Sequence, residues 1–354
     1  MKITDVYNSK TIASVHEEVA SNKIPYLGEG LFPAKKKASL DLKWVKTSKG
    51  LPVSLAPSTF DSVSTIRSRE GFEIAETQMA FFKESMIIKE QDEQDIMRVQ
   101  DSTDPFAQEV IDHIYNDAET LIDGAKVVPE RMRMQLLSAT DGTPKISIAA
   151  DGATYAYNYD TDGSYKANNY LKLSGTSVWS DVENSDPLSD VETAQDSVEA
   201  LTGTRPSIMI VSKQTMNYLK KNKSLKEHIL SQNTSGNVIV TDARVKAVFD
   251  EELGINVIVY SKQYKKEDGT AEKFFPDGHA TLIPDGALGN TWFGMTPEER
   301  TGVNDPTKDV SVVETGVAVS VKTLDDPDQT KTTASEICLP SFERMDETFQ
   351  IACY

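Results

Sequence analysis

Cysteine and histidine are scarce in this chain of 354 residues, which contains two cysteines and four histidines. Cys338 and Cys353 both lie near the C-terminus, and no C-x-x-C or H-x-x-x-H box is present. This excludes a zinc ribbon, a disulfide-stapled fold and a thioredoxin-like redox motif. We expect no metal site, and we expect both cysteines to be free thiols in a reducing compartment.

Long apolar runs and catalytic motifs are absent as well. No run approaches the roughly 18–20 apolar residues that span a bilayer, and the first residues contain no signal-peptide core, so no membrane association or secretion is predicted. The chain has no G-x-x-x-x-G-K-[ST], G-x-G-x-x-G, H-E-x-x-H or G-x-S-x-G motif. We therefore predict a protein that is not an enzyme and has no catalytic residues and no cofactor.

Charge is abundant and unevenly distributed. The net charge is −18, yet residues 1–69 hold 11 Lys and Arg against 6 Asp and Glu. The rest of the chain therefore carries −23. A body this acidic repels phosphate, which argues against sequence-specific DNA binding. The basic N-terminal segment and the acidic body are expected to face different partners.

The basic segment has the pattern of an arm. Residues 33–50 contain six lysines against one aspartate, and the alternation of Leu40 and Leu42 with polar residues predicts a short strand. A solvated linker is the simpler interpretation of a lysine-rich stretch. An arm docked on an acidic neighbour would instead bury its tryptophan and neutralise its charge. We therefore predict intersubunit contacts at Lys35, Lys36, Lys37 and Trp44.

Residues 52–93 predict a long two-stranded excursion with a second apolar stretch at Met79–Ile88. An isolated hairpin of this size is marginally stable in water, so we expect it to rest on a neighbouring subunit. At its tip, arginines suit bidentate pairing with carboxylates, and a glycine permits positive φ. The predicted contact residues at the tip are Arg67, Arg69 and Gly71.

Residues 104–138 predict one long amphipathic helix. Asp104 is a candidate N-cap and Pro105 suits the first helical position. Pro129 removes a backbone donor, so the helix should kink or break there, and Gly124 adds local weakness. Gly124 and Pro129 are candidate hinge residues, although a fixed kink is an equally good interpretation.

After residue 138, the sequence predicts a mixture of helices and strands. Ile146 and Ile148, followed by Asp151-Gly152, predict a hairpin. Asp160–Gly163 resembles half of a calcium loop, but no glutamate occupies its twelfth position, so a turn is the better interpretation. We predict helices at 186–202, 213–231 and 242–253, and strands at 208–211, 257–260, 281–283, 317–321 and 349–351.

Several different short motifs follow one another in a defined order over about 320 residues. They are Leu31-Phe32, Ile66-Arg67-Ser68-Arg69-x-Gly71, Trp179-Ser180, Asp186-Pro187-x-x-Asp190-Val191-Glu192, Val259-Tyr260-Ser261-x-Gln263-Tyr264, Phe274-Phe275-Pro276-Asp277, Leu288-Gly289-Asn290-Thr291, Asp326-Pro327, Pro340 and Phe349. In this order the chain resembles the lambda-type major head protein family of tailed bacteriophages.

The resemblance implies an α+β Hong Kong 97-like capsid fold with an N-terminal arm, an extended β-hairpin loop, a long spine helix, a peripheral sheet domain and a mixed α/β axial domain. It assigns residues 1–51 to the arm and 52–100 to the extended loop. The peripheral domain with the spine helix takes 101–182 and 336–354, and the axial domain takes 183–335.

The function implied is that of a structural capsid protein that assembles with itself into hexamers, pentamers and an icosahedral shell around double-stranded DNA, bound without sequence specificity. The implied partners are a separate scaffolding protein and portal and head-completion proteins, and a decoration protein is left open. The implied location is the virion capsid, assembled in the bacterial host cytoplasm. An encapsulin-like nanocompartment shell and a head decoration or other virion structural protein are the alternatives.

Overall fold

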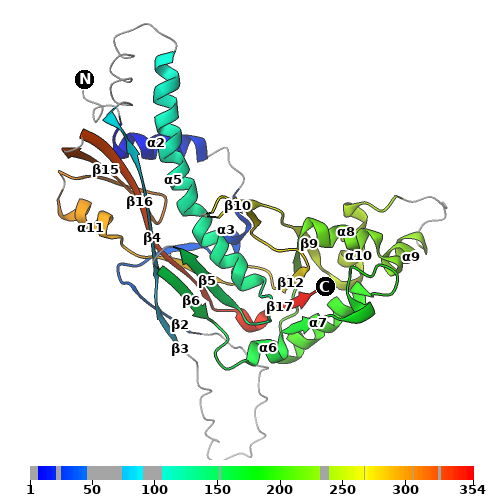
Figure 1. Ribbon diagram of the computed structural model, residues 1–354. Coiled ribbons are helices and arrows are strands. Elements are labelled where there is room, and N and C mark those ends of the chain that lie inside the picture. The colour runs from blue at the N-terminus through cyan, green and yellow to red at the C-terminus, as the bar shows by residue number, and fades with distance from the viewer. Residues whose placement is uncertain are drawn as a thin grey trace, which may run out of the picture. The chain divides into compact units, whose positions relative to one another are not determined.

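The computed structural model describes residues 7–20, 25–45, 74–90, 106–150, 153–231, 239–266, 268–305, 307–325 and 328–354 (Figure 1). The chain forms two compact units. The first comprises residues 1–43, 76–132 and 290–341, and the second comprises 44–75, 133–289 and 342–354. Among the described residues, no helix is long and apolar enough to cross a membrane.

A six-stranded sheet forms the first unit. Its strands follow the order β1-β13-β16-β15-β14, and β4 also pairs with β16. Within this sheet, β1 runs parallel to β13. β16 runs antiparallel to both β15 and β4, and β14 runs antiparallel to β15. The strands are β1 (Ala34–Lys36), β4 (Ala80–Ile88), β13 (Gly289–Phe293), β14 (Asp309–Val313), β15 (Val317–Asp325) and β16 (Asp328–Phe342).

Helix α2 (Ser9–Ala20) packs on β14 and β15, and its ribbon lies beside those of β15 and α5 in Figure 1. Apolar side chains of α2, the two strands and α5 form one core. Ile12 of α2, Ile122 of α5 and Val319 of β15 are each at most 2% exposed in this core. The other helices of this unit are α3 (Leu27–Leu31) and α11 (Pro297–Asn304).

Strand β4 corrects the expectation for residues 52–93. The apolar stretch Met79–Ile88 pairs with β16 of its own chain, from Ala80 opposite Cys338 to Ile88 opposite Thr330. The excursion is therefore not isolated over this stretch, because one edge of β4 is paired within its own chain, and its contact with a neighbouring subunit stays a prediction. Nearer the tip, β3 (Ile74–Gln78) pairs with β2 (Asp41–Val45), as the alternation around Leu42 predicted for β2.

Helix α5 (Phe106–Leu137) confirms the predicted long helix and continues through Pro129, so the predicted break is wrong there and the predicted kink stays a prediction. A proline in a helix interior removes one hydrogen bond but leaves the rest of the ladder intact. Here fully buried side chains follow it closely, including Met132, Met134 and Leu136. Their burial outweighs the local loss of about 3 kcal/mol. Asp104 and Pro105 lie outside the described residues.

A five-stranded sheet organises the second unit, in the order β7-β17-β12-β8-β9, and its core contains Val211, Phe249 and Ile351. The strands are β7 (Tyr170–Lys172), β8 (Ile208–Val211), β9 (Asn256–Val259), β12 (His279–Ile283) and β17 (Phe349–Ala352). The helices are α6 (Ser164–Asn168), α7 (Pro187–Thr202), α8 (Lys213–Lys221), α9 (Lys223–Ser231) and α10 (Asp242–Leu253), with short turns η1 (Gly175–Ser177) and η2 (Met345–Glu347).

Local signals explain several of these elements. Asp186 caps α7 by accepting a hydrogen bond from the Ser189 N–H, Pro187 occupies its first turn, and Gly203 ends it at a φ of 72°. The predicted hairpin is also present as β5 (Lys145–Ala150) and β6 (Ala153–Asn158). A second hairpin, β10 (Gln263–Lys265) with β11 (Ala271–Lys273), was not predicted.

The helix predicted at 213–231 is two helices, because Asn222 separates them. Its Oδ1 accepts a hydrogen bond from the Leu225 N–H at 3.1 Å and so caps α9. Its Nδ2 donates to the Ser185 carbonyl oxygen at 3.0 Å. A buried asparagine whose side chain bonds four backbone and side-chain groups favours a new helix start over continuation.

Candidate functional site

The predicted contact lysines of the arm lie beside β13 of their own chain. β1 pairs in parallel with β13, with Lys35 opposite Trp292. Nζ of Lys36 lies 2.7 Å from Oε2 of Glu299, and Nζ of Lys35 lies 5.5 Å from the centre of the Trp292 ring. Lys35 and Lys36 thus have partners within the chain, although both remain exposed.

The third lysine, Lys37, donates from Nζ to the Asp41 carbonyl oxygen at 2.8 Å. Trp44 is only 9% exposed, and its ring centre lies 5.4 Å from that of Tyr159. The argument that a neighbouring subunit is needed to bury Trp44 is therefore wrong, because its own chain already covers it. A neighbour can still contact the exposed lysines, since a partly solvated ammonium keeps donors available.

The remaining predicted site residues fall into two groups. Arg67, Arg69 and Gly71 lie outside the described residues. Gly124 and Pro129 both lie within α5. A Cβ built on Gly124 would meet nothing within 4 Å, so neither packing nor a special backbone conformation requires glycine there.

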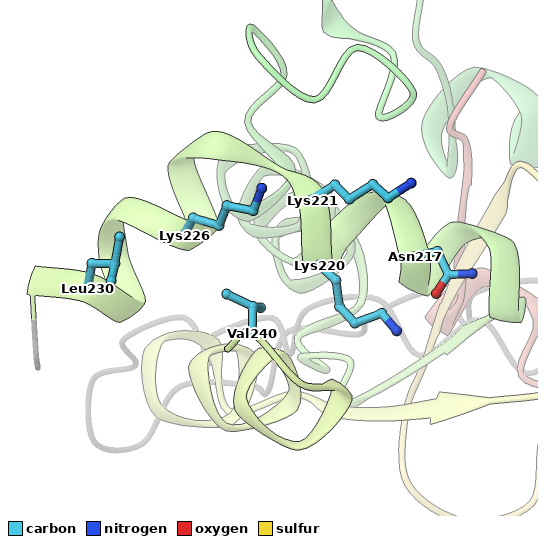
Figure 2. A pocket seen from close by; sticks show the side chains of 6 residues that line it. All are labelled: Asn217, Lys220, Lys221, Lys226, Leu230 and Val240. Atoms are coloured by element: carbon cyan, nitrogen blue, oxygen red, sulfur yellow. The ribbon is translucent and has the colours of Figure 1, made fainter. Parts of the chain in front are cut away.

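A lysine-lined pocket of about 360 Å³ lies on the second unit (Figure 2). Lys220 and Lys221 reach it from α8, and Lys226 and Leu230 from α9. Lys220 is partly neutralised, with Nζ 2.8 Å from Oδ1 of Asp242. The sequence analysis missed this pocket, although a run of lysines at 220–226 within an acidic body was its available signal.

A charge pair between the buried Glu298 and the exposed Lys83 joins three elements of the first unit. Lys83 of β4 and Ser335 of β16 both donate to the carboxylate of Glu298 in the first turn of α11. Burial by itself raises the pKa of Glu298, but these hydrogen bonds outweigh it and hold that pKa below its usual range. Glu298 therefore acts as a charged link between a helix and two strands.

Asp160 and Asp162 hold a turn, as predicted. The two carboxylate oxygens of Asp160 accept hydrogen bonds from the N–H groups of Tyr165 and Lys166, each at 3.0 Å. Asp162 accepts from the Ser164 N–H at 3.3 Å. These carboxylates cap α6, which is the ordinary use of aspartate at a helix start.

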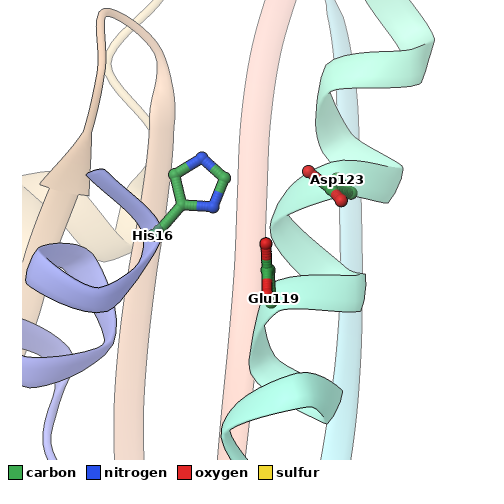
Figure 3. A group of neighbouring side chains, drawn as sticks. All are labelled: His16, Glu119 and Asp123. Atoms are coloured by element: carbon green, nitrogen blue, oxygen red, sulfur yellow. The ribbon is translucent and has the colours of Figure 1, made fainter. Parts of the chain in front are cut away.

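One further polar cluster lies between α2 and α5. Figure 3 shows the His16 ring extending from α2 toward α5, which carries Glu119 and Asp123 one turn apart. Nζ of Lys126 and, at 3.8 Å, Nε2 of His16 both lie beside Oε1 of Glu314. This cluster was not predicted, because the sequence shows only that two carboxylates of α5 are four residues apart and not that His16 lies near them.

The fold defines the class of protein, and it is that of phage capsid proteins, the Hong Kong 97-like fold. A phage-related protein from Bordetella bronchiseptica is similar with a TM-score of 0.58 and 14% identity, over 96% of each chain. A protein assigned as a prophage capsid protein, from Escherichia coli CFT073, is similar with a TM-score of 0.60 and 15% identity, over 98% of this chain and 99% of that one. No curated protein sequence matches this chain.

The sequence family agrees with the fold. The family described as phage major capsid protein E matches residues 9–352, and the chain therefore belongs to that family. It is a structural major capsid protein of a phage or prophage, which builds the virion shell from copies of itself. The predicted family resemblance, fold class and function are confirmed, and the family match favours them over the nanocompartment and decoration alternatives.

Proposed function

We propose that this capsid protein closes an icosahedral shell of hexamers and pentamers, and that two segments make the contacts between subunits. These segments are the arm, residues 1–51, and the extended loop, residues 52–100. The peripheral domain with the spine helix (101–182 and 336–354) and the axial domain (183–335) form the body of each subunit. The family match over residues 9–352 carries this proposal, because it spans all four parts.

The chemistry of the arm supports its role. Lys35 and Lys36 are exposed on a segment whose net charge is opposite to that of the body. Charge complementarity between two copies of one chain steers their association and suppresses wrong contacts. Heterologous contacts of this kind generate rings when the rotation between neighbours closes.

The proposal extends to further partners. A separate scaffolding protein templates assembly in the host cytoplasm, portal and head-completion proteins occupy or seal one vertex, and a decoration protein is a further option. Packaged double-stranded DNA lies inside without sequence-specific contacts, since residues 70–354 carry a net charge of −23. The pocket lined by Lys220, Lys221 and Lys226 offers the phosphates of the DNA a basic recess within this acidic part of the chain. No enzymatic step is part of this function.

Expression of the chain with and without its scaffolding protein, followed by negative-stain electron microscopy, tests the proposal. We expect uniform closed shells with the scaffold, and rings or irregular particles without it. Monomers under both conditions would contradict it.

Arg67→Glu tests the loop contact specifically. The expected product is a soluble, folded subunit that fails to form shells, because a reversed charge repels the acidic surface of a neighbour. Arg244→Glu, at an exposed arginine of α10, is the matched control for charge reversal. Shells at the wild-type yield from Arg67→Glu would show that this contact is dispensable.

A further inference from the structure

The cluster between α2 and α5 has the composition of a cation site. His16, Glu119 and Asp123 each offer one ligand atom, and these three atoms all lie within 4.8 Å of one another (Figure 3). Glu119 and Asp123 are four residues apart on α5, so their side chains project from the same helix face. All three belong to the first compact unit.

The state of His16 is the second observation that points to a ligand. Its side chain is 1% exposed, and neither ring nitrogen has a hydrogen-bond partner among the described residues. Its nearest ion-pair contact, Oε1 of Glu314, lies 3.8 Å from Nε2, which is too long for a hydrogen bond. Buried polar groups in folded proteins are almost always satisfied, so a buried imidazole aimed at two carboxylates calls for a partner.

The charge of the cluster also favours a cation. Glu119, Asp123 and Glu314 contribute three negative charges, and Lys126, which pairs with Glu314, contributes one positive charge. Carboxylates therefore outnumber ammonium groups among these side chains, and a divalent cation suits such a group.

We propose that His16, Glu119 and Asp123 bind a divalent metal ion, with Zn²⁺ as the best match. One imidazole and two carboxylates form a ligand set that suits zinc, whereas Mg²⁺ and Ca²⁺ prefer oxygen ligands throughout. Tetrahedral zinc with bonds of about 2.0–2.2 Å requires the ligand atoms to approach to roughly 3.4 Å. The proposed site therefore requires side-chain rotations that bring the ligand atoms this close, with water completing the coordination.

Glu314 has a supporting role in this site. Metal-bound histidines generally donate their other ring N–H to a carboxylate or carbonyl, which orients the ring. Glu314 lies beside the ring and is itself held by Lys126. Its position at the start of the β14–β15 turn, at a φ of 52°, brings this acceptor to the cluster.

Bound metal would fasten α2 to α5. The N-terminal helix then depends on the ion as well as on its apolar contacts with β14 and β15. Removing the metal is expected to loosen α2 without unfolding the sheet beneath it. The first segment of the capsid subunit would thus be held by a removable ion.

Zn²⁺ binding by the purified full-length protein tests the proposal. After chelator treatment and dialysis, titration calorimetry with Zn²⁺ should find one site per chain, and Mg²⁺ at the same concentration should give none. His16→Gln, Glu119→Gln and Asp123→Asn should each weaken Zn²⁺ binding at least about tenfold. Far-UV circular dichroism of each variant verifies that it is folded.

Two variants serve as matched controls. His228→Gln removes a histidine whose Nε2 lies 3.1 Å from Oε1 of Glu252 in the second unit. Asp117→Asn removes a carboxylate from α5 outside the cluster. Both should bind Zn²⁺ as the wild type does. Absence of Zn²⁺ binding by the wild type, or loss of binding in His228→Gln but not in His16→Gln, would overturn the proposal.

Co²⁺ provides a readout that does not depend on any variant. Co²⁺ bound by the imidazole and the two carboxylates should give the visible absorption bands of a site with few ligands. Added Zn²⁺ should displace the Co²⁺ and abolish these bands. A spectrum identical to that of aqueous Co²⁺ would count against the site even if all three variants were unstable.

Discussion

Nε2 of Gln350 donates a hydrogen bond of 2.8 Å to the carbonyl oxygen of Leu136, which lies 214 residues earlier in the chain. Oε1 of the same amide accepts from the Ala139 N–H at 2.7 Å. The end of a helix leaves backbone carbonyl groups without partners inside the helix. One buried glutamine of β17 thus satisfies a carbonyl at the end of α5 and an N–H two residues beyond the helix.

Gln350→Leu should destabilise the subunit by about 2–4 kcal/mol. The substitution leaves a buried carbonyl and a buried N–H unsatisfied, each costing about 1–3 kcal/mol. Urea unfolding of the unassembled subunit measures this free energy. Gln263→Leu, at an exposed position of β10, should change the free energy of unfolding by less than about 0.5 kcal/mol. Equal stability of the two variants would refute this role of Gln350.

Gly124→Ala should stabilise the subunit by up to about 1 kcal/mol. Alanine is favoured over glycine inside a helix, and its Cβ meets nothing within 4 Å at this position. Gly302→Ala is the contrasting variant, because its Cβ would lie 2.8 Å from Cβ of Val310 and should lower the thermal midpoint.

Gly124→Ala also tests whether Gly124 acts as a hinge. If α5 changes its bend between Gly124 and Pro129 when the shell expands, Gly124→Ala should slow expansion, since a stiffer turn resists bending. Time-resolved light scattering or microscopy of expanding shells measures the rate. Expansion at the wild-type rate would support a fixed helix.

The Glu298 contacts predict a loss of stability in acid. The folded state holds the pKa of Glu298 below that of the unfolded chain, so its contribution is complete above the unfolded value of about 4.3 and disappears as pH falls through the lower folded value. Glu298→Gln should therefore be less stable than wild type at pH 7, and the difference should narrow toward pH 3. Thermal melts across this range measure it, with Glu251→Gln at an exposed position of α10 as the control. A constant difference at all pH values would contradict the assignment.

The arm lysines predict assembly that depends on salt. Lys35→Glu/Lys36→Glu/Lys37→Glu should leave a folded subunit that does not form shells, and the loss of stability should stay near 1 kcal/mol, because the contacts within the chain are partly exposed. Wild-type assembly should weaken as the Debye length falls from roughly 10 Å at 0.1 M salt to about 3 Å at 1 M. Shell yield by sedimentation measures both effects.

A charge exchange separates the two roles of Lys36. Lys36→Glu/Glu299→Lys restores an ion pair within the chain while it reverses the charge that the arm presents. We expect this variant to remain deficient in assembly. A normal shell yield would mean that Lys36 acts only inside its own chain.

Elements with strong local signals were predictable from the sequence. Asp186, Pro187 and Gly203 place both ends of α7, because a cap, a first-turn proline and a left-handed glycine act within a few residues. The same holds for the β5–β6 hairpin, where the alternation of apolar residues and the two-residue turn agree. Family membership was also predictable, since it rests on the order of motifs along the chain.

Tertiary structure alone decided the partners of these elements. β4 has the composition of an exposed hairpin strand, yet it pairs with β16, about 250 residues later in the chain. Likewise, His16 reaches Glu119 and Asp123 only because α2 and α5 pack on the same sheet. Local propensity acts over a few residues, whereas strand pairing and side-chain clusters depend on which distant segments exclude water together. The amino-acid sequence therefore determined the helices, the hairpin and the family, and long-range packing determined which polar groups meet in the interior.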